Sequence, residues 1–129
     1  MVVDTSALIA ILEDEAERPL FTRAIASAPV VRVSAASFLE AGIVLETRRG
    51  PAAVHALDAL AVRSGLKVEE VTEEIARVAL RAFRQFGKGR HAAGLNYGDL
   101  FSYALASVRG EPLLFKGDDF GRTDVIPAP

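Results

Sequence analysis

The hydrophobic residues of this chain follow two alternating patterns. Short apolar runs that suit buried strands are separated by longer stretches in which apolar residues recur at helical spacing. The expected strands are residues 1–3, 29–33, 66–69, 112–115 and 124–126. Strands that alternate with helices are typical of a parallel sheet covered by helices on both faces, so we expect an α/β fold with four to five strands.

Residues that start and stop helices bound several of the expected helices. The strongest helical stripe covers residues 75–86, and Thr72 before it suits a helix N-cap. Ser34 is placed to cap a helix that runs towards Arg49. A glycine–proline pair at positions 50–51 then breaks the chain before a further helix. The pattern therefore places two helices between the second and third strands.

Length and composition favour one globular domain over the whole chain, residues 1–129. Half of the residues are hydrophobic and 25% are charged, a ratio that leaves no room for a long disordered tail. The chain has 15 basic and 17 acidic residues, a net charge of −2, which excludes a generally basic coat for nucleic acid. Any polyanion must therefore bind locally.

Two absences bear on chemistry and location. The chain has no cysteine, which excludes disulfides, a thiol nucleophile and cysteine-built metal sites and fits a reducing cytoplasm. The longest uncharged run near the start, residues 5–12, is far shorter than the ~20 residues of a bilayer span. We therefore expect a cytoplasmic protein without a signal peptide or a membrane segment.

Acidic residues recur where strands end and helices begin. Asp4 directly follows the first strand, Glu40 lies near the second turn of the helix after the second strand, and Asp99 lies at a helix start. Asp118 and Asp119 follow the fourth strand. Ligands bind at the carboxyl edge of open parallel sheets, and all these positions fall on that edge, so we expect the acids to converge there.

Convergence of several carboxylates requires a cation. Two carboxylates about 4 Å apart repel by about 4 kcal/mol at an effective dielectric constant of about 20, and each further acid adds more pairs. Oxygen ligands with no cysteine and no nearby histidine favour Mg²⁺ or Mn²⁺ over zinc. Such an ion activates water and clamps a phosphoryl centre, so the indicated reaction is phosphodiester hydrolysis.

Each acid also has a structural interpretation that the sequence leaves open. Asp4 can cap the first helix, and Asp99 can simply face the positive end of its own helix. Asp118 and Asp119 are common turn residues. Glu40 is harder to explain in this way, because its neighbours along the chain are apolar. The argument for a site rests on the set of positions together.

Four short segments carry these residues in a recognisable order. They are VVDTSAL at residues 2–8, SFLE at 37–40, LNYGD at 95–99 and LLFKGDDF at 113–120. Together they resemble the PIN-domain nucleases, and most closely the VapC toxins of toxin–antitoxin pairs, over nearly the whole chain. The resemblance implies a PIN-like α/β/α sandwich with a central parallel sheet, dependence on Mg²⁺ or Mn²⁺, and cleavage of single-stranded RNA.

The resemblance also implies roles for individual residues. Asp4, Glu40 and Asp99 correspond to three of the family's four acids and would bind the metal. Ser6 would place a hydroxyl near the metal or the phosphate. Asn96 would orient the third acid.

The fourth acid of the set is open between Asp118 and Asp119, and Asp124 is a weaker supporting candidate. In the implied mechanism, water activated by the metal attacks phosphorus and no protein nucleophile is needed. Where a general base is required, Asp99 or Glu40 could serve.

RNA needs basic contacts outside an acidic catalytic edge, because its phosphates supply most of the affinity. The candidates are Arg48, Arg49, Lys88, Arg90, His91 and Lys116. Three of them lie in a glycine-rich loop, residues 87–94, which we expect to be exposed. The resemblance further implies a VapB-type antitoxin that fills the active-site groove, a homodimer, and hetero-oligomers of toxin and antitoxin.

Two other functions fit parts of the pattern. A phosphatase of the haloacid dehalogenase type would use Asp4 as a nucleophile, with Lys116 and the acids at 118–119 completing the site. That family has a second acid where this chain has Ser6, and it would leave Glu40 unused. A PIN fold kept as a catalytically silent binding module would show no metal-dependent turnover.

Overall fold

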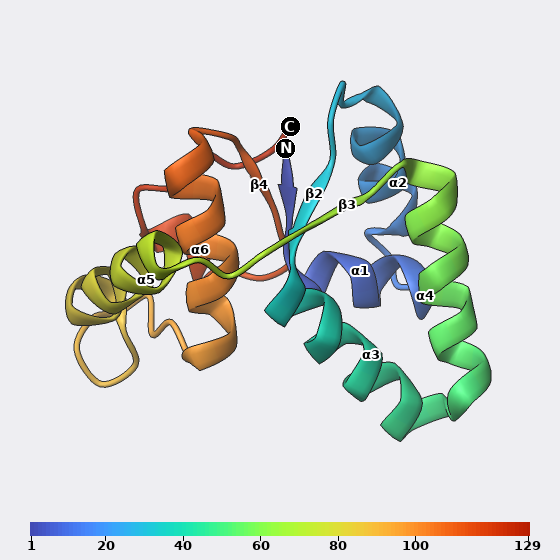
Figure 1. Ribbon diagram of the computed structural model, residues 1–129, viewed down its shortest axis with the longest axis horizontal. Helices are drawn as coiled ribbons and strands as arrows, with labels where there is room; N and C mark the ends of the chain where they lie inside the picture. The colour runs from blue at the N-terminus through green and yellow to red at the C-terminus, as the bar shows by residue number, and fades with distance from the viewer.

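The computed structural model describes residues 1–129 and contains a four-stranded parallel sheet between two layers of helices (Figure 1). The strands are β1 (Val2–Val3), β2 (Arg32–Ser34), β3 (Lys67–Glu69) and β4 (Leu113–Leu114), in the order β3-β2-β1-β4. β1 therefore lies inside the sheet, with β2 and β4 as its neighbours. The predicted α/β fold with a parallel sheet is confirmed.

Six α-helices connect and cover the strands. They are α1 (Thr5–Leu12), α2 (Arg18–Ser27), α3 (Ala35–Arg49), α4 (Pro51–Ser64), α5 (Glu73–Phe86) and α6 (Tyr97–Arg109), and a short 3₁₀ turn, η1, covers Phe120–Arg122. Helices α5 and α6 pack on one face of the sheet and α1 to α4 on the other (Figure 1). None of these helices combines the length and the apolar character that a membrane crossing requires.

The helix boundaries follow from the residues at their ends. Thr72 caps α5 by accepting a hydrogen bond from the Ile75 amide at 3.2 Å, and Ser34 caps α3 in a similar way. Gly50, whose φ of 83° suits glycine, separates α3 from Pro51 at the start of α4. The predicted caps and the predicted break are confirmed.

The fifth predicted strand, residues 124–126, is wrong. The segment after η1 pairs with the sheet only through an isolated bridge between Leu113 and Pro127. The Val125 amide donates instead to Thr123 Oγ1 at 3.3 Å, and the prolines near the end have no amide hydrogen to donate. Because these features prevent a ladder, the sheet has four strands.

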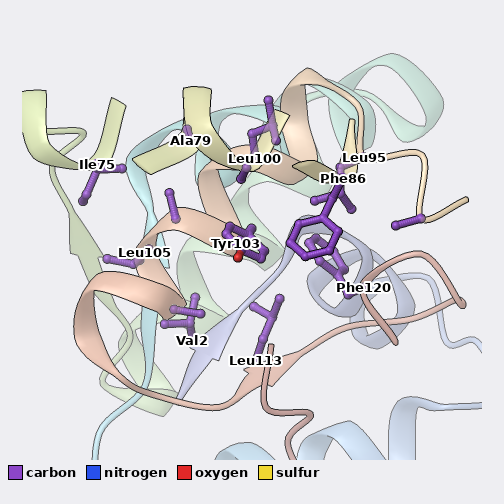
Figure 2. Packing of buried hydrophobic residues seen from close by; sticks show 14 residues of the cluster. Val2, Ile75, Ala79, Phe86, Leu95, Leu100, Tyr103, Leu105, Leu113 and Phe120 are labelled. Atoms are coloured by element: carbon purple, nitrogen blue, oxygen red, sulfur yellow. The ribbon is translucent and has the colours of Figure 1, made fainter. Parts of the chain in front are cut away.

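Two hydrophobic clusters hold the helices against the two faces of the sheet. Val2 packs in the cluster with α5 and α6, where Figure 2 shows it near Leu105 and Leu113. Val3 packs in the opposite cluster, beneath α1 to α4. Because successive residues of a strand face opposite sides, β1 serves both clusters with two residues, and Asp4 follows directly at the carboxyl edge.

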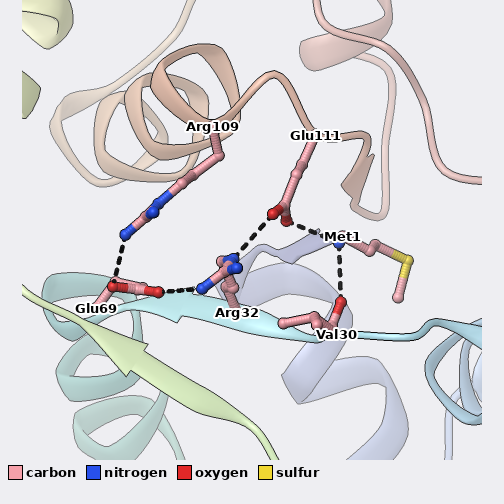
Figure 3. Close-up of polar contacts among 6 residues, drawn as sticks. All are labelled: Met1, Val30, Arg32, Glu69, Arg109 and Glu111. Atoms are coloured by element: carbon pink, nitrogen blue, oxygen red, sulfur yellow. Dashed lines mark hydrogen bonds and ion pairs between the residues drawn. The ribbon is translucent and has the colours of Figure 1, made fainter.

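Ion pairs join the start of β2 to the end of β3 and to Glu111, two residues before β4, and they join the end of β3 to the end of α6 (Figure 3). Arg32 pairs with Glu69 at 2.5 Å and with Glu111 at 2.9 Å. Glu69 also accepts from Arg109 at 3.0 Å, and the Met1 amino group pairs with Glu111 at 2.8 Å. Three positive groups, Arg32, Arg109 and the Met1 amino group, thus share two carboxylates.

Candidate active site

A pocket of about 350 Å³ opens at the carboxyl edge of the sheet. Its wall includes the predicted acids Asp4, Glu40 and Asp99. It also includes the predicted supporting residues Ser6 and Asn96. The fold therefore brings together residues that lie directly after β1, in the first turn of α1, in the second turn of α3 and at the start of α6.

Asp4 is almost completely buried, with 4% of its surface exposed. Its amide donates to the Leu114 carbonyl at 2.9 Å and so extends the pairing of β1 with β4. One carboxylate oxygen accepts from the Ser6 amide at 2.9 Å and the Ser6 hydroxyl at 2.7 Å. The other accepts from the Ser102 hydroxyl at 2.6 Å. Asp4 thus caps α1 and also lines the pocket.

Sequence patterns do not single out the buried serine pair behind Asp4. Ser102 of α6 and Ser37 of α3 are 0% and 1% exposed, and their hydroxyl oxygens lie 3.0 Å apart. Because Ser102 uses its proton on Asp4, Ser37 is the donor to Ser102. A small polar residue on the buried face of each helix is the signal that could have identified them.

Glu40 reaches the pocket from the second turn of α3 and meets the first turn of α6. A β-carbon added to Gly98 would lie 3.1 Å from Cδ of Glu40 and closer still to Oε2, so the carboxylate packs directly against this glycine. The chain neighbours Leu39 and Ile43 are 63% and 56% exposed. The apolar flanks noted in the sequence therefore do not bury Glu40, and its position beside α6 accounts for its place in the pocket.

Asp99 is the third residue of α6 and forms a reciprocal cap with Asn96. The Asn96 amide donates to the Asp99 carboxylate at 3.0 Å, and the Asp99 amide donates to Asn96 Oδ1 at 3.0 Å. Burial raises the pKa of Asp99 to about 6, although the Asn96 amide opposes the rise. The charges of Asp4, Asp119 and Glu40 contribute to this rise. Several negative charges thus act on one oriented carboxylate.

The loop after β4 carries the two candidates for a fourth acid. Asp118 and Asp119 are both exposed and lie outside the pocket wall. Of the two, Asp119 acts on Asp99, whose pKa its charge raises. The loop therefore couples Asp119 more strongly than Asp118 to the acids of the pocket.

Asp124 has a contact away from these acids. Its carboxylate accepts a hydrogen bond from the Tyr103 hydroxyl at 2.6 Å. Burial and this bond raise the pKa of Tyr103. Asp124 therefore holds the segment after η1 against α6 and does not support the carboxylates of the pocket.

Lys116 lines the pocket, and its ammonium pairs with two acids that sequence patterns do not single out. Glu15 and Glu17 lie just before α2, and Glu17 is the residue next to its start. Both carboxylates contact Lys116 Nζ, that of Glu17 at 3.2 Å. Hydrogen bonds to these carboxylates raise the pKa of Lys116. Glu15 also forms part of the pocket wall. A phosphate that approaches Lys116 has to compete with both acids.

The two arginines at the end of α3 share a single acid. Arg48 and Arg49 each pair with Glu13 at 3.2 Å. Arg48 also lines the pocket, whereas Arg49 does not. Of the two predicted RNA contacts on α3, the structure therefore brings Arg48 to the acids.

The other predicted RNA contacts, Lys88, Arg90 and His91, are exposed in the loop between α5 and α6, outside the pocket wall. The Arg90 guanidinium lies 5.0 Å from the centre of the Phe83 ring. The His91 Nδ1 atom accepts a hydrogen bond from the Ala93 amide at 3.0 Å. Arg90 and His91 therefore help to hold the loop, and Lys88 projects from it.

The donor set of the pocket fits a hard divalent cation. Asp4, Glu40 and Asp99 offer carboxylate oxygens from three parts of the chain, and the charges of Asp4 and Glu40 act on Asp99. A cation would relieve the repulsion between carboxylates that, together with the larger effect of burial, raises the pKa of this residue. As the side chains lie, no three acids or histidines are close enough to share one ion, so binding requires the carboxylates to move inward.

The amino-acid sequence matches the family model of the PIN domain over residues 1–126. The chain is 55% identical over 126 residues to ribonuclease VapC28 of Mycobacterium tuberculosis. The aligned region covers 97% of this chain and 95% of that relative. It is 52% identical over 125 residues to ribonuclease VapC of Mycolicibacterium smegmatis, with 97% of each chain covered.

Solved structures share the fold at lower identity. The Mycobacterium tuberculosis toxin VapC20, described as cleaving the sarcin–ricin loop, matches with a TM-score of 0.79 at 24% identity, covering 97% of this chain and 95% of that one. VapBC2 from Rickettsia felis, bound to a DNA fragment from its promoter, matches with a TM-score of 0.77 at 11% identity, covering 98% and 94%. These two likenesses concern the fold.

Proposed function

Because the chain belongs to the PIN-domain family and has VapC ribonucleases as relatives, we propose that it is a metal-dependent endoribonuclease that cuts single-stranded regions of RNA. The observation that carries the proposal is the convergence of Asp4, Glu40 and Asp99 on one pocket. A pocket lined by carboxylates suits a reaction that needs a divalent cation next to a phosphodiester.

Asp4, Glu40 and Asp99 would hold Mg²⁺, or Mn²⁺ in its place. Asp119 is favoured over Asp118 as the fourth acid, because its charge acts on Asp99. When bound, the ion supplies positive charge that activates water and offsets the charge of the phosphodiester.

The protein's own groups would orient the reactants and move a proton. Hydrogen bonds from Ser6 and Ser102 hold Asp4 in one orientation. Asp99, with a pKa of about 6 in the metal-free protein, is ionised near neutral pH and can accept a proton from the attacking water. Glu40 is the alternative acceptor for this proton.

Basic residues around the pocket would hold the RNA by its phosphates. Lys116 and Arg48 line the pocket, so we expect them to contact phosphates next to the cleaved bond. Lys88 in the loop between α5 and α6 would hold a more distant phosphate. The net charge of −2 makes these local contacts the source of affinity for RNA.

The proposed biological role is that of the toxin in a cytoplasmic toxin–antitoxin pair. A VapB-type antitoxin would place a basic side chain against the acids and block the pocket. The names of the VapC relatives support this role. A chain in the solved VapBC2 complex shares the fold of this chain. We further propose that residues 1–129 form one domain, that this domain forms a homodimer, and that toxin and antitoxin form hetero-oligomers.

Cleavage of single-stranded RNA in the presence of Mg²⁺ tests the proposal with Asp99→Asn and a matched control, Asp58→Asn. Asp99→Asn keeps the size of the residue but removes a charge from the pocket, so we expect cleavage to slow by at least about 100-fold. Asp58 is exposed on α4 and lies outside the pocket wall, so its variant should cleave like the wild type. Undiminished cleavage by Asp99→Asn would refute the nuclease assignment.

Hydrolysis of a small phosphate ester by the same proteins separates the two other functions. A phosphatase of the haloacid dehalogenase type needs Asp4 free to attack phosphorus, but this carboxylate is buried and accepts three hydrogen bonds. We therefore expect RNA cleavage without ester hydrolysis. A silent binding module would show neither reaction.

A further inference from the structure

Gly98, the second residue of α6, occupies a place that no other residue could take without moving Glu40. A β-carbon at this position would lie 3.1 Å from both Cδ and Oε1 of Glu40 and would overlap Oε2. Of the ten glycines in the chain, only Gly98 and Gly87 lack space for a β-carbon, and at Gly87 the obstacle is Phe83. Gly98 is thus the glycine at which a carboxylate occupies the space that a side chain would need.

The backbone does not explain a glycine at this position. Gly98 lies within a helix and does not have the left-handed φ that favours glycine. Glycine is less favourable than alanine in a helix, by about 0.5–1 kcal/mol in the interior, and the second position of α6 does not require it. The residue that local helix stability favours is therefore alanine, and the reason for glycine has to be sought in its contact with Glu40.

We propose that Gly98 is a positioning residue, whose lack of a side chain lets the Glu40 carboxylate reach the start of α6 beside Asp99. The inference rests on the proposed function, because it concerns the acids that would hold the metal. The positive end of the α6 dipole favours an acid at this place. A methyl group at residue 98 would push Glu40 away from Asp99 and open the group of ligands.

Binding of Mn²⁺ without RNA, measured by electron paramagnetic resonance, tests the inference in Gly98→Ala. We expect binding about 10-fold weaker than in the wild type, in the range found when groups that orient metal ligands are removed. The melting temperature should be no lower than that of the wild type, because alanine stabilises the helix and Glu40 can turn towards solvent. A variant that loses metal affinity while keeping its stability separates positioning from folding.

Gly42→Ala is the matched control. Gly42 also lies in a helix, only two residues from Glu40 in sequence, and its nearest obstacle is Leu57 Cδ2 at 3.9 Å. The substitution therefore fits, and Mn²⁺ binding should equal that of the wild type. Unchanged binding in Gly98→Ala, or equal losses in both glycine variants, would overturn the inference.

A double-mutant cycle with Glu40→Ala identifies the residue through which Gly98 acts. Once the carboxylate is gone, Gly98→Ala should cause no further loss of Mn²⁺ affinity, and the RNA cleavage rates of the four proteins should show the same non-additivity. Additive losses would overturn the inference. If Glu40→Ala bound Mn²⁺ and cleaved RNA like the wild type, the inference would fail, while inactivity of Asp99→Asn would leave the proposed nuclease function standing.

Discussion

The carboxylate at position 4 performs two tasks at once. One oxygen of Asp4 caps α1 through Ser6, and the other accepts the hydroxyl proton of the buried Ser102. Three hydrogen bonds therefore fix its orientation before any ligand arrives. Loss of a cap costs about 1 kcal/mol, so substitutions of Asp4 combine a stability effect with a chemical one. Asp99 offers the cleaner chemical test.

Asp99 should make the metal-free protein less stable as the pH rises from about 4 to about 6. The unfolded chain loses this proton near the ordinary pKa of 3.8, whereas the folded chain keeps it up to a pKa of about 6. The stability that the bound proton provides is therefore fully present below pH 3.8 and is lost as the pH passes about 6. Asp99→Asn never carries the charge, so in EDTA its melting temperature should exceed that of the wild type near neutral pH and approach it near pH 3.8.

Thermal unfolding followed by circular dichroism over this pH range measures the difference. Asp58→Asn, on the exposed side of α4, is the control, because it removes an aspartate outside the pocket. A difference between Asp99→Asn and the wild type that stays constant with pH would contradict the raised pKa of Asp99.

Asp119 and Asp118 should differ in their effects although they are neighbours. Removing the Asp119 charge relieves repulsion at Asp99, so Asp119→Asn should lower the pKa of Asp99 and, through loss of the proposed fourth acid, slow RNA cleavage about 10-fold or more. Asp118→Asn should do neither. Titration of the Asp99 carboxyl by NMR and a cleavage assay check both effects, and the opposite ranking would assign the fourth acid to Asp118.

The sequence identifies the acids together with Ser6 and Asn96, which bind Asp4 and Asp99, but it does not identify the buried serine that also binds Asp4. Asp4 and Asp99 stand where a strand ends or a helix begins, positions at which a carboxylate is noticeable. Ser102 is one serine in an apolar helix, and its bond to Asp4 spans 98 residues of chain, so no local pattern reveals it. Glu15 is likewise one acid in a polar segment until the fold brings Lys116 to it.

At the scale of elements, the start of α6 determines how Asp99 faces the pocket. The reciprocal bonds between Asn96 and Asp99 close the first turn and orient the carboxylate. Thr72 makes a comparable cap at the start of α5, where the pocket has no wall residue. The two caps therefore allow helix stability to be separated from chemistry.

Asn96→Ala should reduce both stability and cleavage, whereas Thr72→Ala should reduce stability alone. Loss of either cap costs about 1 kcal/mol, which urea unfolding measures. Asn96→Ala also loosens the turn that carries Asp99, so we expect RNA cleavage to slow about 10-fold. Equal cleavage by the two variants would show that the Asn96 cap contributes stability only.

Four of the five predicted strands are present, and all four are shorter than the apolar runs that predict them. An apolar run reports burial, whereas a strand is defined by hydrogen bonds to a neighbour. Pro112, for example, belongs to the predicted run 112–115, but it has no amide hydrogen and β4 begins after it. At β2, the run 29–33 misses Ser34, a polar residue that ends the strand and caps α3.

At the scale of the whole molecule, two hydrophobic clusters share one small sheet. Leu105 is fully buried on the side of α5 and α6, and Leu8 is fully buried on the side of α1 to α4. Strand β1 contributes one residue to each cluster, so neither layer of helices can separate without exposing part of the other. We therefore expect the two layers to unfold together.

Leu8→Ala and Leu105→Ala should each lower the denaturant concentration at the midpoint of one shared unfolding transition. Each removes a fully buried side chain from one cluster, which costs about 2–5 kcal/mol. Denaturant unfolding, followed by fluorescence and by circular dichroism, should give coincident curves for each variant. Two separate transitions, each shifted by only one substitution, would contradict the proposal of one domain.

Strand β1 has only two residues, and both have fixed places in the fold. Val2 and Val3 fill opposite cores, and the next residue supplies the carboxylate at the edge. Since side chains alternate along a strand, inserting or deleting a single residue before Asp4 would misdirect either the valines or the acid. Engineered insertions at this point should abolish folding or activity, and exposed loop positions such as residues 88–92 are the places where added length can be accommodated.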